Sequence, residues 1–141
     1  MHAAPDTVIA PVTLELIGPE ASMPVEAELC YDPADPFAVA VDFLMGLRSV
    51  RWVFARDLLI AGLHEPTGRG DVHAFPSLDA EGRAVVVLEL RSPDGGALLE
   101  ASSRDVIAFL ARSSQAVWPG TESEHLAVDA AIDAILVDSA G

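Results

Sequence analysis

The chain has 141 residues, and 51% of them are hydrophobic, which is enough apolar material for one packed core. Its 22 acidic residues stand against eight arginines and no lysine, so the net charge is −14. This composition excludes a disordered chain, and the charge argues against binding to nucleic acids or to anionic membrane surfaces.

Alternating apolar and polar residues in the first half of the chain predict four strands. We place these strands at 12–16, 25–31, 37–43 and 50–54. The connections between them are short and rich in Gly, Pro and Asp, which is typical of an antiparallel meander with one buried face. Within the fourth strand we expect Trp52 and Phe54 to be largely buried on the same side of the sheet.

The period then changes, because Leu58, Leu59 and Leu63 recur at helical spacing. We expect a short helix over 55–63 that stops at Gly62. The two glycines of the following loop, Thr67–Gly70, are expected to allow positive φ angles.

The second half repeats this plan loosely. Strands are expected at 71–75, 84–91 and 97–101, the middle one central in a sheet, with a turn at Pro93–Gly96. Ser102 or Ser103 is expected to cap a helix near Asp105. The buried face of that helix should hold Val106, Phe109 and Leu110. A last helix should carry an apolar stripe of Val128, Ala131, Ile132, Ile135 and Leu136.

The order of strands, helix, strands and helices predicts an α+β fold. We expect antiparallel sheets in two strand-then-helix halves with C-terminal helices. We also expect a single domain over residues 1–141 with an ordered core at about 8–137. No basic start followed by an apolar run is present, so neither a signal peptide nor a membrane span is expected.

Three polar constellations are candidates for chemistry, and each has a simpler interpretation. Asp32 and Asp35 could bind Ca²⁺ or act as acid and base, but they flank a Pro-rich turn that their side chains can cap. The cluster His64, Glu65, Asp71 and His73 could bind zinc, although its spacing crosses a Gly-rich loop. The sequence Thr67-Gly68-Arg69-Gly70 lacks the Lys and the following helix of a phosphate-binding loop.

The sequence contains no recognisable pattern for a catalytic nucleophile. No Ser lies in a nucleophile elbow. Cys30 is the single cysteine, so it forms no disulfide within the chain and is expected to be a small strand residue. We therefore expect no enzymatic activity, no metal site and no cofactor.

The run from Tyr31 to Asp71 contains a series of short motifs. They are Tyr31-Asp32, Asp35–Val39, Trp52–Leu59, Gly62-Leu63, Pro66–Gly68 and Gly70–Val72. Together these motifs closely resemble one family, the SsgA-like sporulation and cell-division proteins of filamentous actinobacteria, and look closest to its SsgB type. Later pieces such as Gly96–Glu100 and Pro119–Glu122 extend the resemblance to roughly Val12–Leu136. We take the motif residues as structural. They are Tyr31, Asp35, Pro36, Trp52, Phe54, Arg56, Asp57, Gly68, Gly70 and Asp71.

The resemblance implies a non-enzymatic regulator of sporulation-specific septation. It implies a scaffold that helps to localise the division GTPase FtsZ at the septum in the cytoplasm, guided by an SsgA-type partner. It also implies a fold similar to the Whirly-type single-stranded nucleic-acid binders, and a trimer. The alternative function is therefore a Whirly-like module for single-stranded nucleic acid. Clustered arginines on one sheet face would favour that alternative, whereas scattered arginines and an exposed apolar patch would favour the scaffold.

Overall fold

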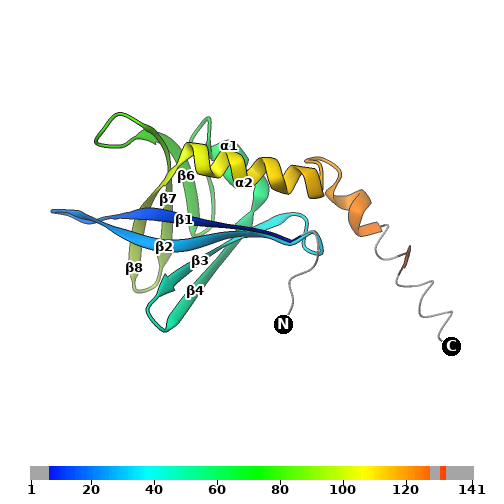
Figure 1. The fold of residues 1–141 in the computed structure, drawn as a ribbon, viewed down its shortest axis with the longest axis horizontal. Helices are drawn as coiled ribbons and strands as arrows, with labels where there is room; N and C mark the ends of the chain where they lie inside the picture. Colours follow the sequence, from blue (N-terminus) through cyan, green and yellow to red (C-terminus); the bar gives the residue numbers. More distant parts are fainter. Residues whose placement is uncertain (1–6, 128–130, 133–141) are drawn as a thin grey trace.

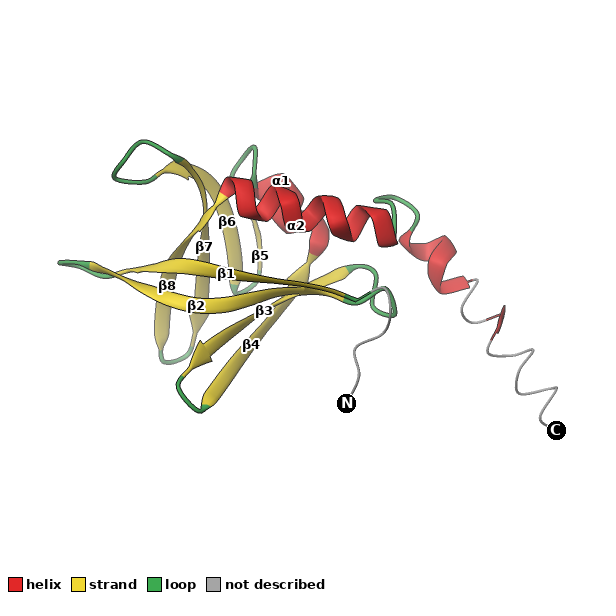
Figure 2. Cartoon of the chain, in the orientation of Figure 1, coloured by secondary structure: helices red, strands yellow, loops and turns green. Residues whose placement is uncertain are grey.

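The computed structural model describes residues 7–127 and 131–132 of the chain. Eight strands and two longer helices are found in this part. Figures 1 and 2 show how they are arranged. In chain order they are β1 (Val8–Ile17), β2 (Ser22–Tyr31), β3 (Ala38–Met45), β4 (Arg48–Ala55), α1 (Arg56–Gly62), β5 (Thr67–Arg69), β6 (Val72–Leu78), β7 (Ala84–Ser92), β8 (Gly95–Ser102) and α2 (Ser103–Ala116). Residues 122–127 add a further helical stretch.

All the described strands belong to one antiparallel sheet in the order β4-β3-β2-β1-β8-β7-β6-β5. The meander β1–β4 is therefore confirmed, as are the α+β class, the two strand-then-helix halves and the interior place of β7. The prediction of separate sheets was wrong. The halves join where β1 pairs with β8, through Glu15 with Glu100 and Leu16 with Leu99. Such a join between distant strands leaves no local pattern in the sequence.

The core lies on the concave side of this curved sheet, where apolar side chains of the strands gather. Inward residues of the central strands, such as Leu14, Leu29, Val41 and Leu88, are almost completely buried. Helices α1 and α2 pack over them, α1 against β4–β6 and α2 against β1, β7 and β8. Burying apolar side chains in this way stabilises the fold by about 25 cal/mol for each Å² removed from water.

Helix α2 forms as its sequence predicts. The Ser102 hydroxyl accepts a hydrogen bond from the Asp105 N–H at 3.5 Å, which confirms the N-terminal cap. Val106, Phe109 and Leu110 are buried on the face that meets the sheet, and Ser113 continues that face.

Two glycines have roles other than those expected. Gly62 ends α1, but the reason for glycine is close packing, since a Cβ there would lie 2.6 Å from the Ala74 Cβ. The segment Thr67–Arg69 is not a loop but β5, which pairs with β6 through a turn at Gly70. Gly70 has the expected positive φ of 63°, whereas Gly68 lies in the strand without one. The strand is too short to show a period, and glycine is uncommon in strands.

Two further expectations need correction, and a third falls partly outside the described residues. Trp52 shares the concave side with Phe54, as predicted, but it is only half-buried because neither helix covers it. Phe37 precedes β3 and is exposed. Of the predicted C-terminal stripe, Ala131 and Ile132 are helical and exposed. Its other members, Val128, Ile135 and Leu136, lie outside the described residues.

Candidate interaction groove

One end of the concave face is left open. Figure 1 shows α1 and α2 on one side of the curved sheet and the turn between β3 and β4 on the opposite side. Because the inward alternation of the strands continues past the end of the helix cover, apolar side chains remain without a packing layer there. They surround a hollow of about 350 Å³ that opens to solvent, which we call the groove.

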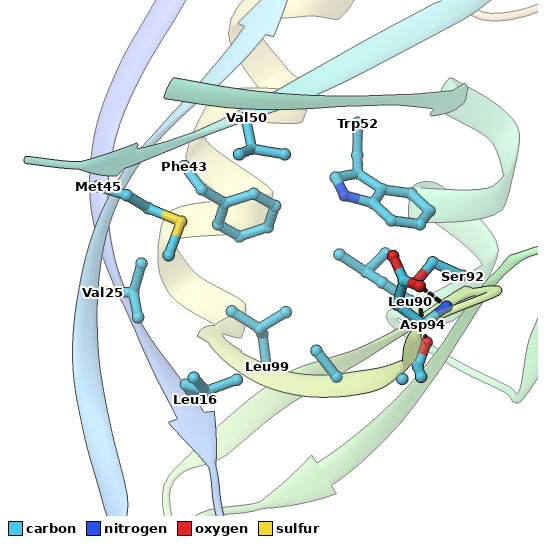
Figure 3. Close-up of a pocket in the computed structure, with 13 residues that line it drawn as sticks. Leu16, Val25, Phe43, Met45, Val50, Trp52, Leu90, Ser92, Asp94 and Leu99 are labelled. Atoms are coloured by element: carbon cyan, nitrogen blue, oxygen red, sulfur yellow. Dashed lines mark hydrogen bonds between the residues drawn. The ribbon is translucent and has the colours of Figure 1, made fainter. Parts of the chain in front are cut away.

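The groove is lined almost entirely by apolar side chains. Figure 3 shows the rings of Phe43 and Trp52 and the side chain of Met45 around this hollow. The apolar side chains that line it, from six strands, are Leu16, Val25, Phe43, Met45, Val50, Trp52, Leu90, Ala97 and Leu99. A hollow of this kind suits an apolar group of a ligand or partner.

The hairpin of β3 and β4 forms an exposed apolar lip beside the groove. Phe43 pairs with Val50 and Met45 with Arg48, so the turn contains only Gly46 and Leu47. Gly46 has a φ of 65°, as the first position of a type II′ hairpin turn requires. Met45 is 59% exposed, Val50 is 43% exposed, and Leu47 is fully exposed. A contiguous apolar surface of this kind is typical of a protein interaction site.

The polar groups at the rim are mostly occupied by their own turn. The Ser92 hydroxyl donates to the Gly95 carbonyl at 3.1 Å, and the Asp94 N–H donates to the Ser92 hydroxyl oxygen at 3.3 Å (Figure 3). These bonds fix the turn between β7 and β8 and leave the Asp94 carboxylate at the rim. The groove is thus equipped for apolar contact, and its rim shows no activated nucleophile.

A second cluster centres on Arg56, whose side chain is completely buried. One of its NH₂ groups donates to the Val117 carbonyl at 2.8 Å and to the Ser113 carbonyl and hydroxyl at 3.3 Å. The other donates to Glu122 at 2.9 Å. Arg56 thereby ties the start of α1 to the end of α2 and to the helical stretch 122–127.

Tyr31 closes this cluster from the side of the sheet. Its ring centroid lies 4.7 Å from the Arg56 guanidinium carbon, a cation–π contact. Its hydroxyl donates to the Pro36 carbonyl at 2.9 Å. The motif residues Tyr31, Pro36 and Arg56 therefore meet in space, and their contacts hold together a turn and two helices.

The ion pair changes the acidity of Glu122. Burial acts to raise the pKa of this carboxyl, but the hydrogen bonds from Arg56 and from the backbone N–H groups of Gly120 and Glu122 outweigh it, so the pKa lies below its usual 4.5. Glu122 is thus charged at neutral pH and balances the buried Arg56. In this arrangement each buried charge has its counterion and hydrogen-bond partners within the fold.

The other predicted motif residues lie in three places outside this cluster: β4 with the start of α1, the β5–β6 hairpin, and the turn after β2, which holds Asp35. Trp52 and Phe54 are on β4. Asp57 is exposed in the first turn of α1, where its negative charge interacts favourably with the positive end of the helix dipole. Gly68, Gly70 and Asp71 form the β5–β6 hairpin, and the Asp71 carbonyl accepts from the Arg91 N–H.

The turn that follows β2 explains the two aspartates there. The Asp32 carboxylate accepts from the Ala34 N–H at 2.9 Å, as expected for a capped turn. The exposed Asp35 takes part through its backbone. Its N–H donates to the Asp32 carbonyl, and its carbonyl accepts from the Ala38 N–H.

Metal binding gains no support from the geometry. In the described part of the chain, no three His, Cys, Asp or Glu side chains converge as metal ligands, and this includes His64, Glu65, Asp71 and His73.

Cys30 faces the outer side of the sheet and is partly buried. Its sulfur lies 3.6 Å from an Asp42 oxygen. Burial first, and then the Asp42 charge, raises the pKa of this thiol to about 11. Because only the thiolate is a strong nucleophile, this raised pKa disfavours nucleophilic chemistry at Cys30.

The arginines are dispersed and mostly engaged. Ion pairs join Arg51 to Asp42, Arg56 to Glu122, Arg83 to Asp79 and Glu81, and Arg91 to Glu89. Arg112 donates to the Ile9 carbonyl. No sheet face therefore offers a cluster of unpaired arginines among the described residues.

Sequence reasoning missed two features of these sites. The groove was missed because the strand pattern does not show where helix cover ends, although the apolar tip Met45-Gly46-Leu47 was a signal. Glu122 was noted only as part of a family segment, and its partner Arg56 lies 66 residues away.

Comparison with known proteins finds a matching family model and similar curated proteins. A family model described as "Streptomyces sporulation and cell division protein, SsgA" matches residues 25–122. The chain is 50% identical over 125 residues to the sporulation-specific cell division protein SsgB of Streptomyces coelicolor, which covers 88% of this chain and 90% of that protein. SsgB of Salinispora tropica is 46% identical over 136 residues, 94% of each chain.

Solved structures agree with these relatives. The crystal structure of an SsgA-like sporulation-specific cell division protein from Thermobifida fusca matches with a TM-score of 0.83 and 36% identity, over 94% of this chain and 98% of that one. A structure of Streptomyces coelicolor SsgB, described with mutations that correlate to longitudinal cell division during sporulation, matches with a TM-score of 0.80 and 50% identity, over 84% of this chain and 94% of that one. Within the described residues, no helix is long and apolar enough to cross a membrane.

Proposed function

The chain belongs to the SsgA family of sporulation and cell division proteins, and we propose that it is a non-enzymatic regulator of sporulation-specific cell division. In this role it is a protein-interaction scaffold that helps to localise the division GTPase FtsZ to septum sites. The observation that carries the proposal is its identity of 50% with a protein named SsgB over nearly its whole length.

The groove supports a binding role. The sequence criterion for the scaffold was an exposed apolar patch with scattered arginines, and both features are present. Aromatic side chains such as Phe43 and Trp52 in a partly open hollow are the type of group that contributes most binding energy at protein interfaces.

The charge distribution speaks against the alternative, a single-stranded nucleic-acid module. Affinity for a phosphate backbone comes from cations that displace counterions, and four of the eight arginines are paired with the chain's own carboxylates. The outer face of the sheet also carries the negative charges of Glu15, Glu28 and Glu100, which repel a phosphate backbone. Glu15 lies directly opposite Glu100. We therefore keep the Whirly-like likeness as a proposal about fold and do not extend it to nucleic-acid binding.

The proposed partners are FtsZ, an SsgA-type protein and further copies of this chain in a trimer, at the division septum. Association would cover apolar side chains that the described residues leave exposed, among them Leu47 and Trp118.

Sedimentation with FtsZ polymers tests the proposal. We expect the purified protein to pellet with FtsZ assembled in GTP and to stay in solution without it. In parallel, the fluorescence anisotropy of a labelled single-stranded oligonucleotide at low salt should remain flat. Salt-sensitive oligonucleotide binding without FtsZ pelleting would contradict the proposal and restore the nucleic-acid alternative.

A further inference from the structure

The two edges of the sheet are built differently. At one edge β5 has only three residues, and the adjoining part of β6 contains Pro76, which has no N–H to offer to another strand. At the other edge β4 has eight residues, no proline and no described strand on its outer side. Since proteins ordinarily block such edges against pairing with other chains, an open edge of this length is a candidate site for a partner.

The register shows which backbone groups point outward from β4. Its ladder with β3 continues at Arg56, whose N–H donates to the Phe37 carbonyl at 2.8 Å, and at its other end the two-residue turn sets Met45 opposite Arg48. Because hydrogen-bonded pairs alternate along an antiparallel ladder, residues 48, 50, 52 and 54 bond to β3. The N–H and carbonyl groups of Ser49, Arg51 and Val53 therefore point away from the sheet.

The open edge also borders the groove. Val50 and Trp52 lie on β4, face the concave side and line the hollow. A strand laid against β4 would place every second side chain on that same side, over the groove. Backbone bonding and apolar pockets for alternate side chains are the two components of peptide recognition by strand addition.

Charge indicates what kind of segment fits. Strand β4 contains Arg48 and Arg51 and no carboxylate, in a chain whose net charge is −14. Arg51 is paired with Asp42 yet its side chain is 58% exposed, and no described carboxylate forms an ion pair with Arg48. An acidic segment is attracted to this edge and repelled by the acidic residues elsewhere on the sheet.

We propose that the outer edge of β4 binds an extended segment of a partner protein as an added strand, with apolar residues at alternate positions over the groove and a carboxylate near Arg48. This inference deepens the proposed function and rests on it for the identity of the partner as a division protein. A helix lying in the groove would leave the outward N–H groups of Ser49, Arg51 and Val53 unused, which is what separates the two modes.

Substitution at Val53 tests the backbone contact. Val53→Pro removes an outward N–H without removing a bond to β3, and edge strands tolerate proline in this position. Val53→Ala is the matched control, since it shortens the side chain and keeps the N–H. We expect Val53→Pro to weaken FtsZ pelleting at least tenfold and Val53→Ala to weaken it less than twofold. Ser49→Pro repeats the test should circular dichroism show that Val53→Pro does not fold.

A synthetic octapeptide that alternates leucine and glutamate tests the same edge without FtsZ. We expect this peptide to slow amide hydrogen exchange of Ser49, Arg51 and Val53 in the wild-type protein. Arg48→Glu should weaken peptide binding at least fivefold, whereas Arg104→Glu, which reverses another exposed arginine on α2, should leave it unchanged.

The outcomes separate the inference from the proposed function. Peptide protection of β4 without FtsZ pelleting would support the strand-addition site and contradict the FtsZ scaffold. FtsZ pelleting that Val53→Pro leaves intact, with no protection of β4 amides, would overturn the strand-addition site and leave the scaffold standing. Loss of both signals would overturn both.

Discussion

Arg56 shows how one residue can hold distant parts of a fold together. It is completely buried, yet its donors reach the end of α2 and Glu122, and its flat guanidinium lies over Tyr31. Only Nε lacks a hydrogen-bond partner among the described residues. Arginine suits this place because its planar guanidinium presents donors in a fixed fork and stacks flat on an aromatic ring, whereas the lysine ammonium is a compact point charge.

The first prediction concerns the partner of this arginine. Glu122→Ala leaves the Arg56 charge buried without a counterion, so we expect the free energy of unfolding to fall by about 3–5 kcal/mol. Urea denaturation measures this change. Arg91→Ala is the control because it breaks an ion pair whose arginine side chain is 59% exposed. Its expected cost is below about 1 kcal/mol. Equal losses in the two variants would contradict the anchoring role of Arg56.

The second prediction is an acid limit set by the same pair. The pKa of Glu122 is lower in the folded chain than its usual 4.5. Its contribution to stability is therefore complete above about pH 4.5 and is lost as the pH falls through the folded pKa. We expect wild type to be more stable than Glu122→Gln at pH 7 and the difference to shrink below pH 4.5. A difference that is constant from pH 7 to pH 3 would refute this assignment.

Residue identity alone did not reveal this pairing. The sequence marked Tyr31, Pro36 and Arg56 as motif residues within a short stretch, and the structure brings them together. Glu122 joins them only because α2 and the turn after it return the chain to Arg56. This contact between distant residues leaves no local pattern in the sequence.

At the scale of elements, local patterns predicted most of the fold. Alternation over five or more residues located β1–β4, a continuous apolar run located β7, and the turn signal at Pro93–Gly96 located β8. Helical spacing with a Ser cap located α2. The missed strand, β5, has three residues, one of them glycine, and owes its existence to its partner β6. The extent of helix cover over the sheet decides the exposure of Trp52, and it follows from packing and not from the strand's own sequence.

The third prediction tests the contact between α1 and β6. Alanine usually stabilises a helix relative to glycine by up to about 1 kcal/mol. At Gly62, however, a Cβ would lie 2.6 Å from the Ala74 Cβ. We therefore expect Gly62→Ala to lower the free energy of unfolding by about 1–3 kcal/mol, as overpacking does.

A double-mutant cycle provides the control for this contact. Ala74→Gly removes the methyl group that the new Cβ would strike. The double variant Gly62→Ala/Ala74→Gly should thus be more stable than the sum of the two single effects by about 1 kcal/mol. Additive losses would show that Gly62 is glycine for another reason.

At the scale of the whole molecule, two properties of the surface stand in tension. The chain carries a net charge of −14, which keeps copies apart, and it also exposes an apolar lip and groove. A contact between copies must therefore be mainly apolar, with repulsion that salt screens.

The fourth prediction follows from that tension and from the proposed trimer. We expect light scattering at on the order of 10 µM protein to give three times the chain mass of 14.8 kDa, with some dissociation at low salt. A monomer that persists at high salt would contradict the trimer. The groove would then be free to bind other proteins and would not lie between copies of this chain.

The central claim is that this chain acts by binding division proteins through its apolar groove and the edge beside it. Affinity capture from sporulating actinomycete cells, with the wild-type protein and with Trp52→Ala as parallel baits, tests it most directly. Trp52 is half-buried, so a folded variant is expected, and its fold is checked by thermal unfolding. The account predicts that wild type retains FtsZ and an SsgA-type protein and that Trp52→Ala retains several-fold less of both. Equal capture by both baits, or nuclease-sensitive capture of nucleic acid without either division protein, would contradict it.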